Sequence, residues 1–344
     1  MIVGTLEDLM GKISTRLAIA AAVGTAFLAA GCAGKAATAT GTKTSPASLS
    51  RALPSPFTVA ARYTAKSLGL VHPTAMAIGP DGNLYVTDSS QRVTVISPAG
   101  KVLRRWGSPG SHPGEFNFIA PDPSAPDATM GKITVGADGK VYVSDSGNGR
   151  VEVFTPQGRF IREFGSYGSG KNQFLRPADL MADSAGNVYV ADDQAETLAK
   201  FSPAGKLLWR IGGGMSGDPD LIGHLHLASI DAHGRLVIVN DDRQRILFID
   251  SSGHKVDAFS PNFSHNFPIG GACEATVDAL GNTYVSGCGP APTLVYNPEH
   301  RLIARWPGTH YTLLRSPVFG PHGEVFALAT DGSILKLHIT LPGA

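Results

Sequence analysis

Three residues with metal-ligating side chains lie at nearly equivalent positions of an internal repeat. Asp179 and Glu274 each lie seven residues before a glycine that recurs along the chain, and His226 lies eight residues before another copy of it. Two carboxylates and an imidazole form a donor set that a divalent cation accepts. Because strand neighbours one residue apart point to opposite faces, the offset of His226 leaves open whether the three side chains converge.

Arg315 lies at the register of His226 in the last copy of the repeat, where its guanidinium could pair with an anion. The sequence contains no Walker loop and no H-E-x-x-H zinc motif. We expect no required cofactor, with a divalent metal at the mouth of a central channel as the alternative.

Two of the three cysteines flank a turn symmetrically. Cys273 and Cys288 lie on either side of residues 279–282. On a two-stranded hairpin this spacing places them opposite each other, within the roughly 5.5 Å between Cα atoms that a disulfide needs. We predict a Cys273–Cys288 disulfide. A pair of metal thiolates is the alternative, although the sequence lacks further cysteines to complete such a site.

A sequence repeat carries these residues and decides the fold. A turn of the form D-G-N followed by a strand recurs six times, first as GPDGNLYVTD at 79–88. The shared glycines are Gly82, Gly139, Gly186, Gly234, Gly281 and Gly323. Each copy contains strand-like segments, and four short strands in a period of ~40 to 50 residues are typical of one β-propeller blade. The fold class is therefore all-β, a six-bladed β-propeller.

The sixth copy ends at residues 334–340 without a fourth strand. Residues 62–69 precede the first copy and loosely match the fourth-strand pattern. We expect this N-terminal segment to pair beside residues 334–339 as an outer strand, because that pairing closes the ring and covers an exposed sheet edge.

Two further sets of residues recur at fixed positions of the repeat, which favours structural roles. The first set closes the second strand of three blades: Asp88, Asp145 and Asp192. We expect these carboxylates to cap turns or to pair with an arginine of the same blade. The second set lies in the last strand of four blades: Trp106, Phe164, Phe259 and Trp306. We expect these rings to pack between blades, with a stacking surface for sugars as the alternative.

The first 31 residues have the layout of an export signal. An apolar run at residues 17–30 follows Lys12 and Arg16, and it is too short to span a membrane comfortably. Its end, LAAGC at 28–32, resembles the lipobox of bacterial lipoproteins, in which the cysteine receives diacylglycerol. The resemblance implies lipidation of Cys32 and attachment to a bacterial cell envelope.

The mature chain then has two parts. Residues 32–55 offer almost nothing to bury and are expected to form a flexible tether, and residues 56–344 form the propeller. The net charge of only +1 argues against a nucleic-acid partner, which would need a basic face. We expect a monomer that contacts the membrane through its lipid alone.

The repeat has the pattern P-x-x-[AM]-x-x-x-x-x-G-x-[LV]-Y-V-[ST]-D, then R-[VI]-x-V-[FI], which resembles the NHL repeat over roughly residues 62–340. The resemblance implies the fold more strongly than a function, because such propellers serve as binding modules, sensors and enzymes. The overall architecture also resembles that of streptogramin lyase. In peptidylglycine-amidating lyase, histidines that begin several first strands hold zinc. Here only His226 matches, because the equivalent residues are Thr74, Ala178, Cys273 and Arg315, and one ligand does not make that site.

The leading prediction is a non-enzymatic module that binds or senses a protein or a small ligand on its loop-rich face. The resemblance to extracellular propellers of bacterial receptor kinases favours this interpretation. The alternative is a metal-dependent lyase or lactonase whose site at the channel mouth contains Asp179, His226 and Glu274.

Overall fold

The computed structural model describes residues 55–118, 131–213, 218–261, 271–287, 292–306 and 317–341. All of them belong to one of the two units of the chain, residues 52–344. The predicted signal peptide, Cys32 and the predicted tether up to residue 54 lie outside these ranges. None of the helices in the described ranges is long and apolar enough to cross a membrane.

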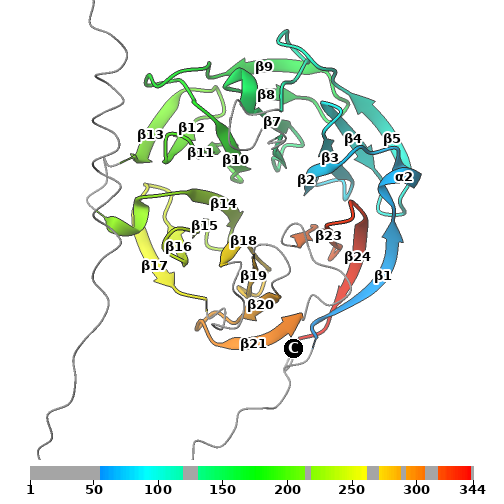
Figure 1. Cartoon of the computed structure of the whole chain (residues 1–344), viewed down its shortest axis with the longest axis vertical. Helices are drawn as coiled ribbons and strands as arrows, with labels where there is room; N and C mark the ends of the chain where they lie inside the picture. Colours follow the sequence, from blue (N-terminus) through cyan, green and yellow to red (C-terminus); the bar gives the residue numbers. More distant parts are fainter. Residues whose placement is uncertain are drawn as a thin grey trace, which may run out of the picture. The chain divides into compact units, whose positions relative to one another are not determined.

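Six four-stranded antiparallel sheets surround a central axis as the blades of a propeller (Figure 1). In chain order the first three blades contain β2 (Pro73–Ile78), β3 (Leu84–Asp88), β4 (Arg92–Ile96) and β5 (Val102–Trp106); β6 (Ile133–Val135), β7 (Val141–Asp145), β8 (Arg150–Phe154) and β9 (Phe160–Phe164); and β10 (Pro177–Ala182), β11 (Val188–Asp192), β12 (Thr197–Phe201) and β13 (Leu207–Gly212). The next two contain β14 (Leu225–Ile230), β15 (Leu236–Asn240), β16 (Arg245–Ile249) and β17 (Lys255–Phe259); and β18 (Ala272–Val277), β19 (Thr283–Gly287), β20 (Thr293–Tyr296) and β21 (Leu302–Trp306). The sixth contains β22 (Val318–Phe319), β23 (Val325–Leu328), β24 (Ile334–Ile339) and β1 (Phe57–Tyr63). The predicted fold class is confirmed.

The repeated glycine makes the turn between the first two strands of every blade. All six glycines have positive φ, from 73° at Gly82 to 84° at Gly323. A residue with a Cβ is strained at such angles, whereas glycine adopts them freely. This conformational requirement explains why the turn glycine recurs along the sequence.

The ring is closed by an N-terminal outer strand as predicted, but the strand begins earlier in the chain. β1 pairs antiparallel with β24 from Phe57 opposite Ile339 to Tyr63 opposite Ile334. The prediction of residues 62–69 is therefore wrong for all but its first two residues. Most of the remainder forms the short helix α2 (Ala65–Leu68), because Thr64 caps its first turn and Gly69, at φ 61°, ends it.

Aromatic residues of the outer strands pack between neighbouring blades, as expected. In each pair the second ring belongs to the next blade, and the ring centroids are 4.6 to 5.8 Å apart: Trp106 with Phe154, Phe164 with Phe201, Phe259 with Tyr296, and Trp306 with Phe57. Such contacts stabilise the packing beyond the apolar area that they bury. The propeller core therefore lies in layers between the sheets.

The three repeated carboxylates at the ends of second strands hold the connectors that arrive from the preceding blade. Asp88 accepts a hydrogen bond from the backbone N–H of Val71, and Asp192 accepts one from that of Leu175. Asp145 accepts one from Asn117 and pairs with Arg150, so the predicted Asp–Arg link within a blade occurs in blade two. All three carboxylates are buried, and capping is their role.

One cysteine of the predicted disulfide lies at the start of blade five. Cys273 lies in β18, next to Ala272, which pairs with Gly287 of β19. Cys288 follows Gly287 in the chain and lies outside the described residues, as does the suggested lipidation site Cys32. The pairing of Cys273 with Cys288 stays a prediction.

Candidate functional site

The innermost strands bring Asp179, His226 and Glu274 to the same level of the central axis. Each lies opposite the residue five positions after its blade's turn glycine: Asp179 faces Ala191, His226 faces Val239, and Glu274 faces Ser286. His226 lies one residue further from its turn glycine than Asp179 and Glu274 do, and a shifted β-bulge compensates for this extra residue. Blades three and five have their irregularity before the site residue, whereas blade four has it after His226, between Leu227 and Ser229.

Lys132 completes this arrangement from blade two. It lies directly before β6; its backbone N–H donates to Ser144 Oγ, and its carbonyl oxygen accepts from the Ser144 N–H, both at 2.9 Å. The sequence interpretation missed this residue, although Lys132 also lies seven residues before its repeat's glycine, Gly139. The register that Asp179 and Glu274 share was therefore the signal that could have identified it. We call Lys132, Asp179, His226 and Glu274 the channel cluster.

The members of the channel cluster alternate in charge and are linked by close contacts. Lys132 Nζ lies 2.9 Å from Asp179 Oδ1 and 3.3 Å from Glu274 Oε1. His226 Nδ1 lies 3.1 Å from Asp179 Oδ2, and its Nε2 lies 3.5 Å from Asp241 Oδ2. The result is a continuous chain of ion pairs across blades two to five, in which one buried carboxylate, Asp179, is shared by two cations.

The electrostatics of the cluster favour its charged forms. Burial opposes ionisation of Asp179, but the Lys132 ammonium and the hydrogen bond from His226 hold the pKa of that carboxyl well below its usual range. Burial likewise opposes the imidazolium of His226, but hydrogen bonds to Asp179 and Asp241 raise its pKa to about 10. The raised pKa of His226 favours its imidazolium form beside the Asp179 carboxylate.

The cluster borders a cavity of about 90 Å³ on the axis. The neighbouring inner-strand positions add apolar and small side chains: Met181, Ala228, Thr276, Pro317 and Val318. At the cluster's level, blade one contributes Ala75. Among the described residues, the cavity therefore has a charged arc on blades two to five and apolar side chains from blades one and six, Ala75 and Val318 among them. Arg315 lies outside the described residues.

The three predicted metal ligands are already paired with Lys132 or with one another, and their role as metal ligands stays a prediction. The Lys132 ammonium contacts both Asp179 and Glu274, and Nδ1 of His226 contacts the other carboxylate oxygen of Asp179. A second donor group lies beside the cluster, where His224, Asp241 and Asp242 each offer a ligand atom within 4.8 Å of the others. All three are at least partly exposed, and His224 and Asp242 already pair at 3.2 Å.

Comparisons with known proteins agree with the fold. A family model described as a 6-bladed beta-propeller matches residues 128–208. The chain is similar to virginiamycin B lyase from Staphylococcus aureus, with a TM-score of 0.56 and 11% identity over 83% of this chain and 100% of that one. It is also similar to a streptogramin B lyase, with a TM-score of 0.55 and 14% identity over 83% and 98% of the two chains. At these identities the likeness shows a shared propeller architecture.

Proposed function

We propose that this protein is an exported, lipid-anchored propeller that binds a small polar ligand at the mouth of its central channel. One observation carries the proposal: charged side chains from four consecutive blades meet at one level of the axis and border a cavity. Their donors and acceptors alternate around the arc, which suits a ligand that carries both kinds of group. Ala75 of blade one and Val318 of blade six, among the described residues, suit a ligand that also has a compact hydrocarbon face.

Blade packing does not require these charges. The core between the blades is apolar, and blade one has the buried Ala75 at the cluster's level. Transferring an ion out of water costs on the order of several kcal/mol in proteins. Charged groups that converge on a cavity with perturbed pKa values are typical of binding or catalytic sites.

A thermal-shift series tests the binding site. The probes are glycine, glucose, succinate and putrescine, which represent a zwitterion, a neutral polyol, a dianion and a dication. At about 10 mM even a ligand of millimolar affinity raises the melting temperature measurably. We expect at least one probe to do so in the wild-type protein, and the shift to disappear in His226→Gln and in Glu274→Gln.

His254→Gln is the matched control, because the side chain of His254 is 80% exposed in the turn between β16 and β17. It should keep the full shift. A series in which none of the four probes shifts the wild type, or in which His226→Gln and Glu274→Gln both keep the shift, contradicts the proposed site.

The anchor is tested separately through Cys32. In cells grown with a labelled fatty acid, the wild-type protein should carry the label and sediment with membranes. Cys32→Ala should be unlabelled and should leave the membrane fraction, because one short hydrophobic signal does not anchor a chain stably. Cys273→Ala is the control, and it should keep the label. A labelled Cys32→Ala protein would exclude lipidation at this position.

A lyase is the second candidate, and the His226–Asp179 pair in the channel favours it. The support from fold is the likeness to a catalytically inactive variant of virginiamycin B lyase from Staphylococcus aureus with quinupristin, at a TM-score of 0.55 and 13% identity. Incubation with quinupristin, with and without added Mg²⁺, followed by chromatography, tests the activity directly. Conversion by the wild type that is lost in His226→Gln would establish it. Elemental analysis of the purified protein tests the metal-dependent form, and a bound ion that is lost in Glu274→Gln would support it.

A further inference from the structure

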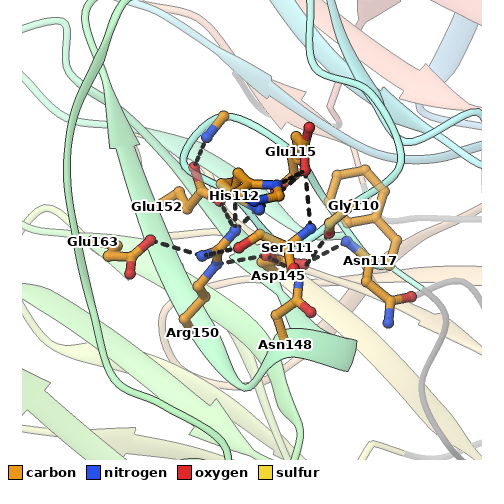
Figure 2. A network of polar contacts seen from close by, with 12 residues as sticks. Gly110, Ser111, His112, Glu115, Asn117, Asp145, Asn148, Arg150, Glu152 and Glu163 are labelled. Carbon is orange, nitrogen blue, oxygen red and sulfur yellow. Dashed lines mark hydrogen bonds and ion pairs between the residues drawn. The ribbon is translucent and has the colours of Figure 1, made fainter.

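Residues 107–118, the described first part of the connector between blades one and two and called the connector below, are tied to blade two by a polar network (Figure 2). The guanidinium of Arg150 in β8 donates to three backbone carbonyl oxygens of the connector at 2.9 to 3.0 Å: those of Ser111, His112 and Glu115. Glu152, two residues further along β8, accepts a hydrogen bond from the backbone N–H of Gly114 at 2.8 Å. Two side chains of one strand therefore hold the backbone of the connector.

This network contains more negative than positive groups. Arg150 contacts three carboxylates, those of Asp145 at 2.8 Å, Glu152 at 2.5 Å and Glu163 at 2.8 Å. Glu152 and Glu163 lie directly opposite each other in the β8–β9 pair, where like charges are destabilising. The connector's own titratable groups, His112 and Glu115, pair with each other at 2.9 Å. One guanidinium therefore serves three carboxylates, two of them fully buried.

Glu152 retains a proton more readily than Glu163, the carboxylate opposite it. Its side chain is 0% exposed, compared with 39% for Glu163. Burial, helped by the charges of Asp145 and Glu163, raises the pKa of Glu152 to about 7, although the Gly114 N–H and Arg150 favour its ionised form. A carboxyl exposed to water titrates near 4.3.

We propose that the connector at residues 107–118 is a proton-operated latch, held on blade two while Glu152 is protonated and loosened when Glu152 ionises. The argument is thermodynamic linkage. The state that binds the proton more tightly is favoured at low pH, and here that is the closed state, in which the connector buries Glu152. Stability of the closed state is fully present below the pKa that Glu152 has when exposed. It is lost as the pH rises toward 7.

The next connector, residues 165–176, is an internal control. Its backbone has the same form, with parallel bridges between Pro109 and Phe116 in the first connector and between Tyr167 and Phe174 in the second. The positions of Arg150 and Glu152 in β8 are occupied in β12 by Thr197 and Ala199. The second connector is therefore similar in shape but lacks the buried carboxyl.

Hydrogen exchange of the full-length protein tests the latch. Exchange of residues 107–118 is measured at several pH values between 5.0 and 7.5 and corrected for the intrinsic pH dependence of amide exchange. Opening of this connector should increase roughly tenfold or more across that range, as expected for a group whose pKa falls on opening. Residues 165–176, in the same sample, should show no comparable change.

Two variants identify the group responsible. Glu152→Gln keeps an acceptor for Gly114 but cannot ionise, so its connector should stay as protected at pH 7.5 as the wild type is at pH 5.0. Glu163→Gln is the matched control, because Glu163 also pairs with Arg150 but is partly exposed. This variant should keep most of the pH dependence. The latch is excluded if Glu152→Gln keeps the wild-type pH dependence, if both connectors respond alike, or if protection rises with pH.

A direct titration keeps the proposal testable even where Glu152→Gln fails to fold. Carbon NMR of the glutamate carboxyl groups in the wild-type protein should show one buried glutamate with a midpoint near neutral pH. A Glu152 midpoint near the ordinary value of about 4.3 would overturn the proposal.

Discussion

A chain that begins at Thr64, and so lacks β1, should melt roughly 10 °C or more below a chain that begins at Ser55. Removing β1 exposes the hydrogen-bonding edge of β24 over its whole length, because β1 pairs with β24 from Phe57 to Tyr63. It also removes a core side chain. Phe57 is 6% exposed, and its ring packs against Tyr284 and Trp306 at centroid distances of 5.8 and 4.6 Å.

Point variants separate the two contributions to closure. Phe57→Ala should lower the free energy of unfolding by about 3 to 5 kcal/mol, measured by urea denaturation, since it leaves a cavity between blades five and six. Val59→Ala is the control on the same strand, because Val59 is 41% exposed, and it should change the stability by under about 0.5 kcal/mol. Equal melting temperatures for the chains that begin at Thr64 and Ser55 would show that the ring does not depend on β1.

Lys132→Met should be the most destabilising single change in the channel. It removes the cation between Asp179 and Glu274 and leaves Asp179, whose side chain is 6% exposed, with a buried charge that only His226 then balances. Breaking a buried ion pair from one side typically costs about 3 to 5 kcal/mol. Urea denaturation at neutral pH measures this loss.

Lys140→Met provides the matched comparison for this prediction. Lys140 pairs with Asp138, but both side chains are more than 40% exposed, so its loss should cost at most about 1 kcal/mol. The double variant Lys132→Met with Asp179→Leu should recover part of the free energy of unfolding that Lys132→Met loses. In the double variant the Asp179 carboxylate, which Lys132→Met leaves without its lysine partner, is also removed. Equal effects of Lys132→Met and Lys140→Met would mean that the channel cluster is solvated and is not a built site.

Local sequence patterns predicted the blades because each depends on a local physical requirement. Gly82 and its five counterparts recur because the turn needs positive φ, and Asp88, Asp145 and Asp192 recur because each connector needs an acceptor at the same place. The closing strand was predicted less well. Residues 65–68 were assigned to it by pattern, whereas a Thr64 cap and a Gly69 end make them a short helix.

The sequence by itself determined the six-bladed fold, the register of Asp179 and Glu274 and the need for an outer strand from the N-terminus. Tertiary structure decided whether the site residues meet. In blades three and five the β-bulge lies before the site residue, whereas in blade four it lies after His226. This shift turns His226 toward the same axis as Asp179 and Glu274. Contact across the axis then joins Lys132 to Glu274, residues separated by 142 positions. Only closure of the ring brings such distant side chains together, because no repeat of the chain contains more than one of them. The three suspected ligands of a metal thereby became, with Lys132, one arc of paired charges.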